Sequence, residues 1–263
     1  MVRQNLHCHT SFDDGADTPE EMVLAAIDSG LTSLGISAHI PIAGEPWCMP
    51  EENVAPFRAE MARLKSAYEG RIKLYCGMEY DLSVPADFDG YDYIIGSGHI
   101  VDGCYEDFDL AHHKLLIEHF GGPKGAAEAY FENLTKVADF EEISIVGHFD
   151  LLTKYNEQEP LYDTTAKYFR DAAYAAMEKL SAADKIFEIN TGAISRGYRT
   201  SPYPSAEFLR HLNKIGGRIC ISSDSHSAKD LTCGFEQAEQ IARSCGFTEL
   251  WEFNGRGFEP AAF

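Results

Sequence analysis

The sequence predicts an α/β protein whose parallel strands close into a distorted barrel. Short runs rich in β-branched and aromatic residues alternate with longer amphipathic stretches, which is the pattern of parallel strands joined by crossover helices. Seven or eight such units favour a closed barrel over an open sheet, and a length of 263 residues is common for one barrel. Because the units differ in length, we expect the barrel to be distorted, with residues 1–263 forming one domain.

The predicted strands are short apolar runs that end in polar or glycine-containing segments. They cover Asn5–Thr10, Ser33–Ala38, Lys73–Glu79, Tyr93–Gly98, Ser144–Phe149, Lys185–Asn190 and Arg218–Ser223, followed by a short last run at Glu249–Phe253.

The predicted helices lie between these strands. The first has Thr18 as N-cap, Pro19 at the first helical position and Glu21 placed to complete a capping box. The full set covers Pro19–Ser29, Pro56–Tyr68, Gly125–Ala138, Thr164–Ala182, Ser205–Lys214 and Gly234–Ser244.

Charge and cysteine content narrow the function classes. The chain carries 42 acidic and 22 basic side chains, so its formal net charge is −20, and we expect no binding to nucleic acid. An anionic substrate needs a local positive site, which divalent cations would supply. The 7 cysteines lack close pairing and no apolar leader precedes His7, which indicates a reduced, cytoplasmic protein. Apolar runs such as Tyr93–Ser97 are too short to span a bilayer, so we expect no membrane partner.

Histidine and carboxylate residues collect where the predicted strands end. In α/β barrels, functional side chains gather at the carboxyl ends of the strands and in the loops that follow. The candidates are His7, His9, Asp14, His39, Glu79, His99, His148, Asp224 and His226. Randomly placed histidines would not fall at strand exits this often. The remaining four are expected in or beside helices: His112, His113, His119 and His211.

The spacing of these residues suits metal binding. His7 and His9 are two apart and so point to one face of a strand, whereas Cys8 points into the core. Such a pair alone is as often two ordinary histidines as a metal site. The complete set of nine favours metal, and a carboxylate such as Glu79 can bridge two ions.

Imidazole and carboxylate ligands without thiolate suit Zn, Fe or Mn rather than Ca or Mg. One ion takes about four to six ligands, so nine candidates imply two to three divalent metal ions. Adjacent ions are a standard device for transferring a phosphoryl group to water. The sequence therefore predicts a metal-dependent phosphatase.

The ordered motifs resemble those of the polymerase and histidinol phosphatase (PHP) superfamily over essentially the whole chain. They are His7-Cys8-His9-Thr10, Asp14-Gly15, His39, Gly77-Met78-Glu79, Gly96-Ser97-Gly98-His99, Gly147-His148-Phe149-Asp150 and Ser223-Asp224-Ser225-His226. The resemblance implies a distorted (β/α)7 barrel with a trinuclear metal centre. Glu188–Arg196 and Pro202–Ser205 are similar to the monofunctional histidinol-phosphate phosphatases within that superfamily.

The resemblance also implies how the ligands divide among three ions. His7, His9, Glu79 and Asp224 would hold the first ion. The second would share Glu79 and add His99 and His148. Asp14, His39 and His226 would hold the third, with Asp13 as the rival of Asp14.

Side-chain chemistry suggests roles for further residues. Asp14 or His226 would help to protonate the leaving oxygen, and Arg196 and Lys154 would contact the phosphate. The implied substrate is L-histidinol phosphate, an intermediate of histidine biosynthesis. Its cationic amine could meet an acidic side chain, for which the candidates are Asp81, Asp102, Asp107 and Asp109.

Three alternatives remain open at this point. The chain could be a phosphoesterase that acts on a nucleotide or sugar phosphate, or a metal-dependent amide or lactone hydrolase on a similar barrel. It could also be a metal-carrying regulatory domain without turnover, which the complete ligand set disfavours.

Overall fold

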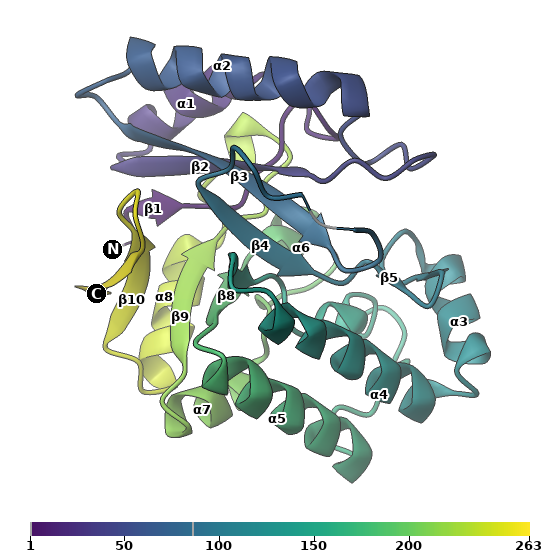
Figure 1. The fold of residues 1–263 in the computed structure, drawn as a ribbon. Coiled ribbons are helices and arrows are strands. Elements are labelled where there is room, and N and C mark those ends of the chain that lie inside the picture. Colours follow the sequence, from purple (N-terminus) through teal and green to yellow (C-terminus); the bar gives the residue numbers. More distant parts are fainter. Residues whose placement is uncertain (1, 86) are drawn as a thin grey trace.

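A computed structural model describes residues 2–85 and 87–263, and its centre is a barrel of seven parallel strands (Figure 1). Neighbours in the sheet follow the order β1-β2-β3-β4-β7-β8-β9. These strands are β1 Gln4–Asn5, β2 Ser33–His39, β3 Lys73–Asp81, β4 Tyr93–Ser97, β7 Ile143–Val146, β8 Ile186–Asn190 and β9 Arg218–Ser222. The predicted α/β barrel is therefore confirmed.

The first and last strands of the barrel meet through a short contact instead of a full ladder. Cys8 and Ser225 form an isolated parallel bridge, where the amide of His9 donates to the carbonyl of Ser225 at 2.8 Å. The amide of Asp224 donates to the carbonyl of His7 at 2.8 Å. This contact, which we call the barrel seam, joins the segment after β1 to the segment after β9 and places the candidate ligands His7, His9 and Asp224 side by side.

The interior of the barrel is filled by apolar side chains, so it is not a channel. Its core consists of Leu6, Tyr75, Tyr93, Ile95, Ile145, Ile186, Cys220 and Phe253. The Tyr93 hydroxyl donates to the carbonyl of Leu6. A Cβ on Gly35 or Gly77 would overlap the Tyr93 ring, which explains why these strands carry glycine there. The packed interior leaves no room for a binding site inside the barrel.

Helices surround the barrel and bury a larger core against its outer face (Figure 1). They are α1 Pro19–Asp28, α2 Val54–Ala67, α3 Leu110–His119, α4 Pro123–Leu134, α5 Lys167–Ala182, α6 Gly192–Ser195, α7 Ala206–Lys214 and α8 Phe235–Ser244. Short 3₁₀ turns cover Glu51–Asn53, Thr135–Asp139, Leu151–Thr153 and Ala228–Asp230. The Thr18 capping box predicted for α1 is present.

Several elements differ from the sequence prediction. The predicted strand Asn5–Thr10 is a regular strand only at Gln4–Asn5, and the short elements Ile100–Val101, Cys104–Tyr105, Gly192–Ser195 and Phe258–Ala262 were not predicted. Helix α3 was not predicted, because its histidine-rich sequence lacks a clear apolar stripe. The predicted strand Glu249–Phe253 exists as β10, but it lies outside the barrel and pairs antiparallel with β11 (Phe258–Ala262).

The β10–β11 hairpin closes the amino end of the barrel. The Gln4 side-chain amide donates to the carbonyl of Phe253 at 2.9 Å and accepts from its amide at 2.7 Å. The two chain termini lie near this hairpin, on the same side of the molecule (Figure 1). The carboxyl ends of the strands remain open at the other end, where a second hairpin, β5 (Ile100–Val101) and β6 (Cys104–Tyr105), follows β4.

Helices long and apolar enough to cross a bilayer are absent from residues 2–85 and 87–263.

Candidate metal centre

All nine predicted metal ligands converge at the carboxyl end of the barrel. They come from different strand exits, as the parallel arrangement requires. Seven of them are buried, whereas His226 and Asp14 lie at the open side with 24% and 28% of their side chains exposed. The predicted set of His7, His9, Asp14, His39, Glu79, His99, His148, Asp224 and His226 thus forms one connected cluster.

Glu79 lies at the centre of the cluster and is 1% exposed. Its Oε2 lies 3.1 Å from His7 Nε2, 3.4 Å from His9 Nε2 and 3.1 Å from His39 Nδ1. Its Oε1 faces the other side, 3.0 Å from His148 Nε2 and 3.4 Å from His99 Nε2. The two oxygens therefore address two separate groups of imidazoles, which is the position expected of a bridging ligand.

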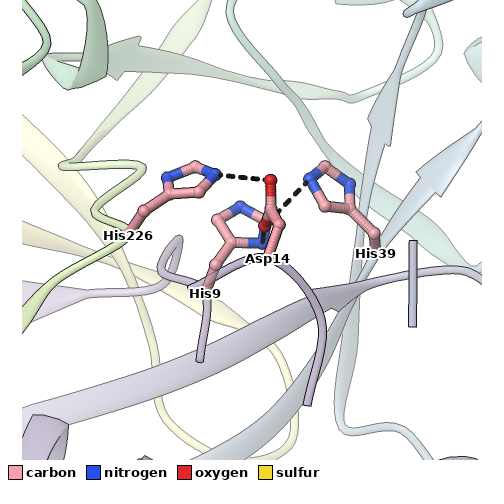
Figure 2. A group of neighbouring side chains, drawn as sticks. All are labelled: His9, Asp14, His39 and His226. Atoms are coloured by element: carbon pink, nitrogen blue, oxygen red, sulfur yellow. Dashed lines mark ion pairs between the residues drawn. The ribbon is translucent and has the colours of Figure 1, made fainter. Parts of the chain in front are cut away.

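A second group lies at the more open side of the cluster (Figure 2). Asp14 Oδ2 is 3.2 Å from His226 Nε2, and Asp14 Oδ1 is 3.9 Å from His39 Nε2. The ring of His9 stacks between those of His39 and His226, with centroids 4.3 Å from each. Figure 2 shows Asp14 among the three imidazoles.

Asp224 links the barrel seam to this cluster. Its Oδ1 lies 3.4 Å from His9 Nε2 and 3.7 Å from His7 Nε2. Its backbone is in the left-handed region, with φ at 49°, which Asp tolerates better than most residues. Strained backbone of this kind is frequent at functional sites.

Three sets of donor atoms are close enough to share an ion. Within each set the atoms lie within 4.8 Å of one another, and the sets are His7, His9 and Asp224; His39, Glu79 and His99; and His9, Asp14, His39 and His226. His148 joins the cluster through Glu79. These sets overlap with the three ion sites that the family resemblance implies, and they differ in placing His39 and His9 between two sites.

The donor atoms fit a divalent ion of the Zn, Fe or Mn type. The Nε2 atoms of His7 and His9 are buried and make no hydrogen bond among the described residues, although both point at carboxylates. An orphaned buried nitrogen is costly unless something coordinates it. Cys8 lies in the core and its thiol donates to Gly35 O, so the thiol takes no part, as predicted. The set is therefore nitrogen and oxygen only.

Electrostatics in the cluster are strongly coupled. Burial alone raises the pKa of Glu79, but His7 and His39 pull that pKa well below its usual range. Burial lowers the pKa of His9, but Asp13 and Asp224 together raise it to about 10. The carboxylates thus favour positive charge at this place, which a divalent cation would supply.

Further carboxylates stand behind the ligands, in a supporting role that the sequence analysis did not predict for them. Asp13 Oδ2 lies 2.7 Å from His9 Nδ1 and accepts from the amide of His39 at 3.0 Å. Asp81 Oδ2 lies 3.2 Å from His99 Nδ1. Such partners fix the ring orientation and the tautomer of a metal-binding histidine.

Glu188 is the most buried of these carboxylates. It is 0% exposed, with Oε1 at 2.7 Å from His7 Nδ1 and Oε2 accepting from the amide of His148 at 3.0 Å. One signal in the sequence could have revealed it, because a glutamate between Phe187 and Ile189 in an apolar strand is unusual.

We expect Glu188→Gln to weaken metal binding by roughly 10- to 100-fold, as measured by competition with a chelator. A glutamine presents one acceptor oxygen, so it cannot accept from both His7 and His148. The matched control is Glu249→Gln, an exposed glutamate on β10. Equal metal affinity in Glu188→Gln and wild type would show that this carboxylate does not support the ligands.

The cluster forms the floor of a cavity of about 360 Å³. Arg196 and Lys154, which the sequence analysis offers as phosphate contacts, both line it. Arg196 Nη2 is 2.9 Å from Asp224 Oδ2, and its Nη1 is 3.0 Å from His226 Nδ1. Lys154 Nζ donates to the carbonyl of Asp107 at 2.8 Å.

The acidic residues that sequence analysis offered for a substrate amine are separated by the structure. Asp107 lines the cavity, whereas Asp81 stands behind His99. Asp102 pairs with His119 on the surface, and Asp109 caps α3. Asp107 is thus the member of that set placed to meet a ligand.

The fold and this cluster define a metal-binding α/β barrel of the hydrolase type. A family model described as the PHP domain matches residues 5–192. The match covers most of the chain, which therefore belongs to the PHP domain family.

Individual relatives are similar over nearly the whole chain. A protein of Deinococcus radiodurans named "Probable histidinol-phosphatase" is 25% identical, with 97% of each chain covered. A protein of the same name from Schizosaccharomyces pombe is 25% identical over 88% of this chain and 82% of its own. The crystal structure of histidinol phosphate phosphatase from Lactococcus lactis, complexed with Zn, L-histidinol and phosphate, superposes with a TM-score of 0.75. That protein is 22% identical and the match covers 98% of each chain, which supports the fold.

Proposed function

We propose that this protein is a metal-dependent phosphomonoesterase that hydrolyses L-histidinol phosphate to L-histidinol and phosphate. The position of Glu79 carries the proposal, because its two oxygens face two groups of imidazoles and can join adjacent ions. The names of the two relatives that match over most of the chain support histidinol phosphate as the substrate.

The nine clustered residues would hold two to three divalent ions of Zn, Fe or Mn. Such ions activate water and neutralise the charge on phosphoryl oxygens. Because the cluster lines the cavity, ions held there would face a phosphate ester bound in it. This arrangement supplies the local positive site that a chain of net charge −20 needs for an anionic substrate.

Two residues at the open side are proposed to assist the departure of the alcohol. Asp14 and His226 lie 3.2 Å apart and both line the cavity, so either can hold the proton that the leaving oxygen receives. Water thus adds to phosphorus, the ester P–O bond breaks, and the alcohol leaves with that proton.

Arg196 is proposed to bind the phosphate while it orients Asp224 and His226. Its planar guanidinium already donates to both ligands and its side chain is 30% exposed toward the cavity side of the cluster. Lys154 is proposed as a second cationic contact, held in place by Asp107 and by the ring of Tyr198, whose centroid is 4.7 Å from Nζ.

We expect Arg196→Ala to lower kcat/KM for L-histidinol phosphate by about 10²-fold, since it removes one preorganised donor to a charged group. Arg256→Ala, at an exposed arginine on the β10–β11 turn, is the matched control. If KM and kcat/KM of Arg196→Ala equal those of wild type, this residue does not belong to the site.

The substrate is tested with a panel of phosphomonoesters assayed for released phosphate. Histidinol phosphate should rank first, ahead of nucleotide and sugar phosphates, with the enzyme loaded with Zn or Mn. If histidinol phosphate is hydrolysed poorly but other phosphomonoesters are hydrolysed well, the proposed substrate is wrong and the proposed phosphomonoesterase reaction still stands. Hydrolysis of amides or lactones but of no phosphate ester would contradict both.

A further inference from the structure

Outside the metal cluster, the cavity is lined mainly by rings. Its apolar members are Trp47, Tyr105, Phe108, Leu151 and Tyr198. Trp47 lies against the cluster itself, since its ring centroid is 4.8 Å from that of His39 and 5.3 Å from that of His99. Whatever alcohol is attached to a phosphate at the cluster must therefore pass along this wall.

Glu45 joins two of these rings, although they come from different segments. Its Oε2 accepts from Trp47 Nε1 at 3.0 Å, and its Oε1 accepts from the Tyr105 hydroxyl at 2.6 Å. Trp47 belongs to the loop after β2, whereas Tyr105 ends β6. One carboxylate thus fixes the distance between the two rings.

Phe108 continues the wall at the rim. It is 53% exposed, which is unusual for so large an apolar side chain, and its ring centroid is 5.6 Å from that of Tyr105. The start of α3 directly after it is fixed by Asp109, which accepts from the amide of His112 at 2.8 Å. A ligand ring inserted here would cover the exposed aromatic face of Phe108 at a low cost in conformational entropy.

The wall offers few neutral hydrogen-bonding side chains for a sugar. Among the described lining residues, serine, threonine, asparagine and glutamine side chains are absent, and these are the usual partners of several neighbouring hydroxyls. The Tyr105 hydroxyl is already bound to Glu45. A volume of about 360 Å³ is at the small end for ligand sites, so it suits a phosphate with one ring.

We propose that Glu45 is a positioning residue that holds Trp47 and Tyr105 as two walls of a subsite for one flat aromatic ring in the alcohol half of the substrate. The inference rests on the proposed phosphomonoesterase function and adds to it a residue that sets specificity for the ring of the substrate. Glu45 is not among the described residues that line the cavity and contacts Trp47 and Tyr105 from behind, so its loss should affect ring-bearing substrates selectively.

The test compares L-histidinol phosphate with L-alaninol phosphate, which has the same aminoalkyl phosphate and a methyl group in place of the imidazolylmethyl group. Wild type should prefer the ring-bearing ester by roughly 50-fold in kcat/KM, as burial of one ring would give. Glu45→Ala should reduce kcat/KM for histidinol phosphate by about 10-fold, mostly through KM, because two hydrogen bonds to a charged group are lost. Alaninol phosphate should change less than about twofold, since a small alcohol does not use the wall.

Tyr105→Phe distinguishes the effect of the hydrogen bond to Glu45 from the effect of the ring, because it removes the hydroxyl and keeps the ring. Tyr105→Phe should lower kcat/KM for histidinol phosphate, as Glu45→Ala does. The double variant should have a kcat/KM no lower than that of Glu45→Ala alone. Glu52→Gln, at an exposed glutamate a few residues along, is the control that should change neither ester.

Three results would overturn the inference. They are equal wild-type kcat/KM for the two esters, equal losses on both esters in Glu45→Ala, and additive losses in the double variant. The first two leave the phosphomonoesterase function standing. If metal-loaded wild type hydrolyses neither ester nor any other phosphomonoester, the proposed function fails and the inference fails with it.

Discussion

Glu79→Gln should abolish turnover, with a loss of at least ~10³-fold in kcat, which corresponds to a barrier raised by about 4 kcal/mol. The amide keeps the size and shape of the side chain but removes the charge and one of the two acceptor oxygens. Because Oε1 and Oε2 face different imidazole groups, the variant should lose the link between them. Metal content per chain should fall together with kcat.

The matched control for Glu79→Gln is the exposed Glu249→Gln on β10, which should keep wild-type activity and metal content. Circular dichroism would verify that both variants are folded. A Glu79→Gln enzyme with kcat within tenfold of wild type would contradict the central, bridging position given to this carboxylate.

Removal of metal should abolish activity and also destabilise the protein. The carboxylates of Glu79, Asp224 and Asp14 lie close together around shared histidines. A bound cation would offset the free-energy cost of burying these negative charges. An ion at a thousandfold excess over its Kd stabilises the fold by about 4 kcal/mol. For a chain of this size, that corresponds to a fall in Tm of roughly 8 °C or more per ion removed.

The measurement is calorimetry and phosphate release before and after exhaustive chelation, with re-addition of Zn, Mn or Fe. Activity and Tm should return together. Glu79→Gln serves as the internal control, since its Tm should respond weakly to added metal. A chelated wild type with unchanged Tm and unchanged turnover would exclude a metal centre.

Much of this architecture could be predicted from the sequence. Strand and helix alternation predicted the parallel barrel, and reading the residue at each strand exit placed all nine cluster residues. This prediction succeeds because parallel strands bring their carboxyl ends to one end of the barrel, so residues that follow different strands become neighbours in space. The i, i+2 spacing of His7 and His9 likewise predicted that both side chains point into the cluster, although regular strand pairing in β1 ends at Asn5.

Other features depend on contacts between distant segments and left weak local signals. Glu188 supports His7 from a position 181 residues further along the chain, and Asp13 accepts from the amide of His39 on the next strand. Glu45 bridges Trp47 to Tyr105 across two loops. The run Glu249–Phe253 has the pattern of a strand, but only packing of Phe253 against the barrel interior decides that it closes the amino end instead of joining the sheet.

The metal content of the reconstituted protein tests the central claim most directly. After chelation, incubation with excess Zn, Mn or Fe and removal of unbound metal, mass spectrometry of the digested sample should give two to three ions per chain, and Glu79→Gln should give fewer. One ion or none in wild type would contradict a multinuclear phosphatase centre built around Glu79.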